Sequence, residues 1–223
     1  MKKGPSAGFS ESWLQEVVDC GKQFYDRRWM YGTAGNLSVK VNQSPLEIAI
    51  TPSGAHKGSL KPTDLIHLKD KGDGKLEPQV KKGAELPIPS AETAIHQAIH
   101  QTLPGCGAVF HVHPVHATLL SALVGNPQHR QTLEIEWFEM LKCLGIGEGE
   151  IGMLPIFPNW QDIPKVAQEV HQYLLQTPNA PPAILLYNHG VTAWGRNPEQ
   201  ARNHLEAVEY VCEYLYLKKQ LKS

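Results

Sequence analysis

Two histidines separated by one residue, His111 and His113, are the side chains whose spacing first suggests chemistry. They end an apolar run at residues 108–113, which we expect to be a β-strand closed by Pro114. Side chains two positions apart on a strand point to the same face, so these two imidazoles can share one metal ion. An H-x-H pair also occurs in structural roles, and the pair alone does not establish a metal site.

A third ligand is needed, because a catalytic zinc usually takes three protein ligands and keeps one position open. His189 is the best candidate. It follows a short apolar run at residues 183–187, which we expect to be a central strand, and it precedes Gly190 in a turn. A histidine at a second strand end makes the metal hypothesis much stronger than the H-x-H pair does.

Three other histidines are weaker candidates. His96 and His100 stand four residues apart on an expected helix and could clamp a metal, but Gln97 occupies the position of the catalytic glutamate in the H-E-x-x-H pattern. We therefore expect these two side chains on a half-solvated helix face. His116 could support a metal ligand from behind, although nothing in the sequence selects it.

Three loops of small residues could bind an anion. One opens an expected strand at residues 35–38, a second closes a strand at residues 51–54, and Ser90 begins a helix whose free N–H groups favour a phosphate. Such residues are normal in turns, so each loop alone is a weak signal. Together, beside a metal, they suggest a phosphate pocket. Lys57 would add a positive charge there, unless it is an ordinary surface lysine.

Glu92 and Glu139 are the candidates for proton transfer. Glu92 lies in the first turn of the helix that Ser90 begins, where acidic residues are common for electrostatic reasons alone. Glu139 stands in an apolar stretch at residues 137–141, and burial there would raise its pKa toward a range useful for proton transfer. The alternative for Glu139 is the exposed face of an amphipathic helix.

The elements that must position these residues alternate between hairpins and helices. Two hairpins are expected at residues 37–51 and 65–76, the second around a Gly-Asp-Gly turn. Hairpins mixed with helices indicate an α/β layered domain with a mainly antiparallel or mixed sheet covered by helices. We expect a flexible tail at residues 1–9 and a single domain at residues 10–223. Helices are expected at residues 10–29, 90–103, 115–123, 134–144, 163–175 and 198–219.

Composition excludes several classes of protein. The 223 residues are 41% hydrophobic and 19% charged, which is typical of a globular domain. The net charge of −1 argues against a nucleic-acid partner, and no apolar run approaches the roughly 20 residues that span a membrane. The four cysteines are widely spaced without a C-x-x-C pair. These features favour a reduced, soluble protein of the cytoplasm.

The chain resembles the class II sugar-phosphate aldolases and epimerases over about residues 12–217. Five blocks occur in the order found in that superfamily: Ala34-Gly35-Asn36-Leu37-Ser38, Thr51-Pro52-Ser53-Gly54, Ser90-Ala91-Glu92, His111-Val112-His113-Pro114 and Asn188-His189-Gly190-Val191. Within it the sequence is most similar to the methylthioribulose-1-phosphate dehydratases of methionine salvage. The narrower resemblance rests on residues 89–96, 111–121, 138–142 and 190–195.

The resemblance implies the roles of individual residues. It implies one zinc ion per subunit on His111, His113 and His189, and a homotetramer with sites near the subunit interfaces. In similar dehydratases the glutamate that matches Glu139 is the proposed acid/base, whereas the aldolase pattern gives that role to the residue at Glu92. Ala91 stands where the aldolase pattern has a second phosphate-binding serine. Phosphate contacts are implied for Gly35, Asn36, Ser53, Gly54 and Ser90.

The resemblance therefore implies a zinc-dependent dehydratase whose substrate is a small phosphorylated sugar, 5-methylthioribulose 1-phosphate. The nearest alternative is a class II aldolase or a pentulose-phosphate epimerase, which would use the same metal and phosphate but break another bond. An alternative of a different class is a non-catalytic interaction module on the same fold. Retention of all three histidines argues against that module, which has no need for them.

Overall fold

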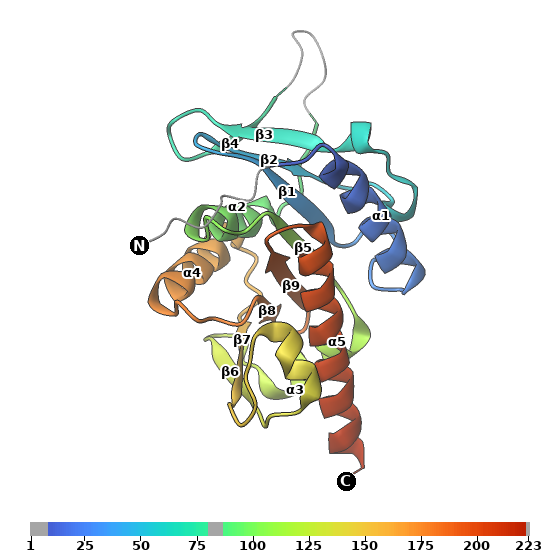
Figure 1. The fold of residues 1–223 in the computed structure, drawn as a ribbon, viewed down its shortest axis with the longest axis vertical. Coiled ribbons are helices and arrows are strands. Elements are labelled where there is room, and N and C mark those ends of the chain that lie inside the picture. Colours follow the sequence, from blue (N-terminus) through green and yellow to red (C-terminus); the bar gives the residue numbers. More distant parts are fainter. Residues whose placement is uncertain (1–8, 80–86, 222–223) are drawn as a thin grey trace.

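The computed structural model describes residues 9–79 and 87–221, and one mixed sheet runs through them (Figure 1). Its strand order is β4-β3-β2-β1-β5-β9-β8-β7-β6. Every neighbouring pair is antiparallel except β7 and β8, which are parallel. The strands are β1 (Asn36–Gln43), β2 (Leu46–Ile50), β3 (Ile66–Asp70), β4 (Leu76–Pro78), β5 (Ala108–Val112), β6 (Gln131–Ile135), β7 (Gly152–Phe157), β8 (Ala183–Leu186) and β9 (Gly190–Gly195).

Helices cover both faces of this sheet, which confirms the predicted α/β layered class. On one face a large core cluster joins α1, α3 and α5 to the sheet, and on the other face a second cluster joins α2 and α4 (Figure 1). The helices are α1 (Ser12–Asp26), α2 (Thr93–Thr102), α3 (Val115–Val124), α4 (Ile163–Gln176) and α5 (Pro198–Gln220). Short 3-10 turns are η1 (Lys57–Ser59), η2 (Pro62–Asp64) and η3 (Glu139–Leu144).

Strand β5 shows how the period of two divides residues between these layers. Phe110 and Val112 pack in the cluster of α1 and α5, whereas Val109 packs in the cluster of α2 and α4. His111, two residues beyond Val109, therefore faces the α2 side of the sheet. The same alternation in β1 buries Leu37 and Val39 toward α1 and turns the residues between them toward α2.

Most predicted elements are confirmed, with shifted ends. Both hairpins form, as β1–β2 and β3–β4, and the predicted strand at residues 183–187 lies between two neighbours as β8. Helix α1 spans a shorter range than the predicted 10–29, because Arg28 adopts a positive φ of 65° that ends it. Asp162 caps α4 by accepting a hydrogen bond from the backbone N–H of Lys165.

Two predictions about the local structure are wrong, and two strands were not predicted. The helix expected at residues 134–144 is a strand, β6, followed by the short turn η3, because β6 pairs along its whole length with β7. Strands β7 and β9 were not predicted. The helix predicted from residue 90 begins only at Thr93, so Ala91 precedes it and is exposed.

The tail predicted at residues 1–9 lies outside the described residues except for Phe9. The ring of Phe9 packs edge-on against Trp13, with the ring centroids 6.2 Å apart. Within the described part of the chain, no helix is long and apolar enough to cross a membrane. All four cysteines are free thiols, and three of them are buried.

Candidate active site

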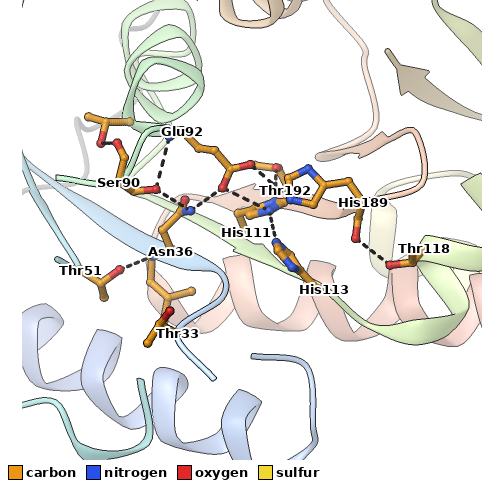
Figure 2. A network of polar contacts seen from close by, with 12 residues as sticks. Thr33, Asn36, Thr51, Ser90, Glu92, His111, His113, Thr118, His189 and Thr192 are labelled. Atoms are coloured by element: carbon orange, nitrogen blue, oxygen red, sulfur yellow. Dashed lines mark hydrogen bonds and ion pairs between the residues drawn. The ribbon is translucent and has the colours of Figure 1, made fainter. Parts of the chain in front are cut away.

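The candidate site lies where three elements meet on the α2 face of the sheet: the end of β5, the turn between β8 and β9, and the start of α2 (Figure 2). Strand register aligns the elements here. His111 of β5 stands opposite Asn36 of β1 on one side and opposite Thr192 of β9 on the other. His111 and Thr192, which are 81 positions apart in the chain, are therefore neighbours.

Four potential metal ligands converge at this point: His111, His113, His189 and Glu92. The Nε2 atoms of His111 and His113 are 2.8 Å apart. One carboxylate oxygen of Glu92 lies 3.4 Å from His111 Nε2, and the other lies 3.6 Å from His189 Nε2. One ligand atom from each residue lies within 4.8 Å of all the others. The structure thus brings together the three predicted histidines and adds Glu92 to them.

The protonation of this cluster fits a divalent cation. Burial lowers the pKa of His111 well below its ordinary value, and the nearby His189 lowers it further. Burial, followed by His111 and His189, lowers the pKa of His113 to about 3. Both rings are therefore neutral near pH 7 and offer the lone pairs that a metal needs. Oxygen Oε1 of Glu92 is buried without a hydrogen-bond partner among the described residues, as expected for an oxygen free to coordinate.

Hydroxyl and amide groups next to these ligands contact them and fix their orientation (Figure 2). Thr192 Oγ1 lies 3.0 Å from Nδ1 of His111, and Asn36 donates a 2.6 Å hydrogen bond from Nδ2 to Glu92. Thr118 of α3 donates a 2.7 Å hydrogen bond to the carbonyl oxygen of His189. Sequence reasoning missed Thr192 and Thr118. Strand alternation from Gly190 would have found Thr192, whereas nothing local marks Thr118.

Two glycines allow the backbones to approach closely at this site. A Cβ atom on Gly190 would lie 2.3 Å from the carbonyl oxygen of Val112, between the two histidine-bearing segments. Gly35 has a positive φ of 74°, and a Cβ atom there would lie 2.8 Å from the carbonyl oxygen of His111. A side chain at either position would push the ligand-bearing strands apart.

Of the residues predicted to bind phosphate, only Asn36 and Ser90 form hydrogen bonds with Glu92. Ser90 accepts a 3.0 Å hydrogen bond from Asn36, so both side chains belong to the Glu92 network. Ser53 and Gly54 lie on an exposed loop. That loop reaches the segment before α2, because Ser53 N donates to the carbonyl oxygen of Ile88 at 3.0 Å. Gly35 precedes β1 directly and packs against His111.

Lys57 is not the ordinary surface lysine that the sequence left open. Its side chain is buried, and Nζ donates 2.8 Å hydrogen bonds to the carbonyl oxygens of Thr33 and Ala55. Burial lowers the pKa of Lys57 to about 8. Its ammonium group therefore ties together the two loops that flank the start of β1.

Glu139 lies apart from the metal ligands of its own chain. Its side chain is 79% exposed and forms a 3.1 Å ion pair with Lys142, so the predicted burial is wrong within one chain. The turn η3 that carries Glu139 follows β6, the edge strand that lies four positions from β5 in the sheet. At roughly 4.8 Å per strand, these strands are about 19 Å apart. Turn η3 also packs on α5, on the face opposite α2.

His96 and His100 were expected on a half-solvated face of α2, and this prediction is wrong. Both side chains are completely buried between α2 and the sheet. The hydroxyl of Ser38 lies 2.7 Å from His96 Nδ1 and 3.0 Å from His100 Nε2. His116 hydrogen-bonds Glu209 of α5 at 3.0 Å and contacts no metal ligand that the structure describes.

Known proteins resemble this chain along nearly all of its length. A profile described as the class II aldolase and adducin N-terminal domain matches residues 15–216. A methylthioribulose-1-phosphate dehydratase from Microcystis aeruginosa is 39% identical over 207 residues, which cover 92% of this chain and 96% of that protein.

Two further matches are a longer protein that is similar in sequence and a solved structure with a similar fold. A probable bifunctional methylthioribose-1-phosphate isomerase/methylthioribulose-1-phosphate dehydratase from Nocardia farcinica is 38% identical over 88% of this chain, which spans only 34% of that longer protein. The solved structure of YgbL from Escherichia coli, a putative aldolase/epimerase/decarboxylase, superposes with a TM-score of 0.72. It is 25% identical, and the match covers 93% of this chain and 89% of that one.

Proposed function

Because the chain belongs to the class II aldolase and adducin N-terminal domain family, we propose that it dehydrates 5-methylthioribulose 1-phosphate to 2,3-diketo-5-methylthiopentyl 1-phosphate. It is accordingly a lyase of methionine salvage. The observation that carries this proposal is the 39% identity to a dehydratase of that name over almost the whole of both chains. The cluster of three histidines and one glutamate supports it, because such a reaction needs an electrophile beside a ketose carbonyl.

One zinc ion per chain is our proposal for the cation, with His111, His113 and His189 as its protein ligands. Three imidazoles form a donor set that suits zinc, and Glu92 lies close enough to be a further ligand. When bound, the ion supplies a Lewis acid that stabilises negative charge developing on the C2 oxygen of the substrate. Thr192 keeps the ring of His111 in the orientation that this role requires.

The acid/base step requires a carboxylate. A carboxylate base takes the proton from C3, and the resulting carboxylic acid returns a proton to the hydroxyl that departs from C4, so that one water is lost. The enol left at C3 and C4 then tautomerises to the second ketone of the product. We propose Glu139 for this role. Glu92 is the alternative, and its proximity to His111 and His189 suits either a ligand or a base.

The position of Glu139 makes an oligomer part of this proposal. Within one chain, Glu139 is not among the converging ligands, and its exposed side chain pairs with Lys142 on η3, the turn that packs on α5. A neighbouring copy would therefore present it to the substrate. We therefore propose a homotetramer whose sites lie at subunit interfaces, with Glu139 contributed by the adjacent subunit.

The phosphate of the substrate is proposed to bind beside Glu92. The backbone of Gly35, the hydroxyl of Ser90 and the exposed loop with Ser53 and Gly54 lie around the start of β1 and the segment that leads into α2. Lys57 is buried with its ammonium group bonded to a carbonyl oxygen of each flanking loop, and its positive charge would favour the phosphate. Asn36 orients Ser90 in the same network and completes the proposed contacts.

A substrate panel tests the proposal. The purified, zinc-loaded protein would be assayed with methylthioribulose 1-phosphate, fuculose 1-phosphate and ribulose 5-phosphate. We expect loss of one water from the first compound and no turnover of the other two. Cleavage of fuculose 1-phosphate would identify an aldolase, and conversion of ribulose 5-phosphate would identify an epimerase. A protein that turns over none of them and binds no metal would be a non-catalytic module.

A further inference from the structure

A ladder of polar contacts joins β1 to α2 directly behind the metal ligands. Side chains on one face of a strand repeat every 6.6 Å or so, and residues four apart on a helix rise about 6 Å, so the two can pair in step. Asn36 and Ser38 lie on the α2 face of β1, while Glu92 and His96 lie at the start of α2. The first rung is Asn36 with Glu92 (Figure 2), and the second is Ser38 with His96.

The second rung is buried and uncharged. Ser38, His96 and His100 have no solvent exposure. The single hydroxyl hydrogen of Ser38 can be donated to only one of the two rings, so the other ring must donate to the oxygen. Burial lowers the pKa of His96 to about 4 against the opposing effect of Glu92, so the ring is neutral at neutral pH. Nε2 of His96 has no hydrogen-bond partner among the described residues.

A third rung closes the ladder at the other end of α2. Lys40, the next residue on this face of β1, directs Nζ to the carbonyl oxygens of Leu103 and Pro104, at 3.3 and 3.2 Å. Those carbonyl groups follow the last turn of α2, where a positive charge is favourable. The three rungs therefore fix both the rotation of α2 and its position along β1.

The carboxylate of Glu92 depends on this placement. Glu92, the N-cap residue of α2, makes no capping hydrogen bond with its side chain, and its carboxylate receives its one described hydrogen bond from Asn36. Burying polar side chains lowers the stability of the fold unless each polar group has a hydrogen-bond partner. Aliphatic side chains between α2 and the sheet would pack without this requirement. Polar pairs specify one alignment of two elements, which aliphatic side chains do not.

We propose that His96, held by Ser38, is a positioning residue that places the Glu92 carboxylate against the metal. His96 is not among the four converging ligands and acts only through the helix that carries Glu92. The inference deepens the proposed function, because it rests on the metal site described there. It assigns a role to a histidine whose spacing with His100 suggested a second metal site.

The test is a double-mutant cycle on metal binding. His96→Phe and Ser38→Ala would each be made in the wild-type chain and in Glu92→Ala, and the dissociation constant for Zn²⁺ would be measured by chelator competition. In the wild-type background we expect binding to weaken about tenfold or more, the range for groups that orient ligands. In the Glu92→Ala background we expect a change of less than about twofold, because the residue being positioned is gone.

The visible absorption of Co²⁺-loaded protein gives an independent readout. The spectrum of His96→Phe should shift toward that of Glu92→Ala, since both lose the carboxylate from the coordination sphere. His171→Phe is the matched control. In the wild type, Nδ1 of His171 lies 2.6 Å from Thr102 Oγ1 at the far end of α2. The dissociation constant for Zn²⁺ and the Co²⁺ spectrum should therefore stay unchanged in this variant. If His96→Phe does not fold, Ser38→Ala decides the question alone.

Equal weakening in both backgrounds would overturn the inference, because His96 would then act on the site without Glu92. Unchanged binding in the wild-type background would overturn it as well. Failure of the proposed function is a separate outcome: a protein that binds Zn²⁺ and shows the expected coupling, yet dehydrates no substrate, would refute the dehydratase and leave the positioning role standing.

Discussion

Substitution of Gly190 by alanine tests how closely β9 must approach β5 at the metal ligands. The new Cβ atom would lie 2.3 Å from the carbonyl oxygen of Val112 and 3.1 Å from Cδ2 of His113. Ordinary van der Waals contact begins at 3.4 Å, so the two backbones must separate by about 1 Å. His189 directly precedes the substituted residue, and the shift therefore moves one ligand away from the other two.

A displacement of about 1 Å at a preorganised site typically costs about 100-fold in function. We expect Gly190→Ala to bind Zn²⁺ about 100-fold more weakly than the wild type, as measured by chelator competition at pH 7. Gly105→Ala is the matched control, because its φ is not positive and no described atom lies within 4 Å of the Cβ that alanine would add. Wild-type affinity in Gly190→Ala would refute the close-approach argument, as would equal losses in the two variants.

Three further predictions concern the ligands, the acid/base and pH. Thr192→Val removes the hydroxyl group that contacts His111 Nδ1 and should weaken zinc binding by roughly 10–100-fold. The control Thr132→Val, on the exposed edge strand β6, should bind zinc as the wild type does. Equal zinc affinities in the two variants would contradict the role of Thr192. At equal metal content, Glu139→Gln should lower kcat by about 10²–10⁴-fold, and a near-normal kcat would assign the base to Glu92, to be checked with Glu92→Gln. The folded-state pKa values of His96 and His113 lie below the unfolded value near 6.5, so the metal-free protein should be fully stabilised by them above that pH. Its free energy of unfolding should fall from about pH 6.5 toward pH 4, by roughly 2 kcal/mol per buried histidine at pH 5. Denaturant melts that give the same free energy at pH 7 and pH 5 would contradict this.

The three histidine ligands could be predicted from the sequence, because short-range sequence patterns determine their positions. The strand period of two puts His111 and His113 on one face, and Pro114 ends the strand beside them. His189 stands in a turn between an apolar run and Gly190, which marks a second strand end. These signals extend over only a few residues and do not depend on how distant strands pair.

The burial of His96 and the position of Glu139 outside the metal cluster could not be predicted from the sequence, because each depends on contacts between distant segments. His96 is covered only after β1 pairs with β5 and α2 packs on the face that they share, and its partner Ser38 lies 58 residues away. Glu139 is remote because the unpredicted strands β7 and β9 place β6 at the far edge of the sheet. An apolar stretch such as residues 137–141 does not reveal whether its own chain or a neighbour covers it.

The most direct test of the zinc-dependent dehydratase is a zinc titration of the chelator-treated protein with methylthioribulose 1-phosphate as substrate. The product would be identified by mass spectrometry as the substrate less one water. We predict no dehydration before zinc is added, a rise in proportion to added zinc, and saturation at one ion per chain. His113→Ala should show no such rise. Full dehydration by the metal-free protein, or an unchanged titration in His113→Ala, would contradict the central claim.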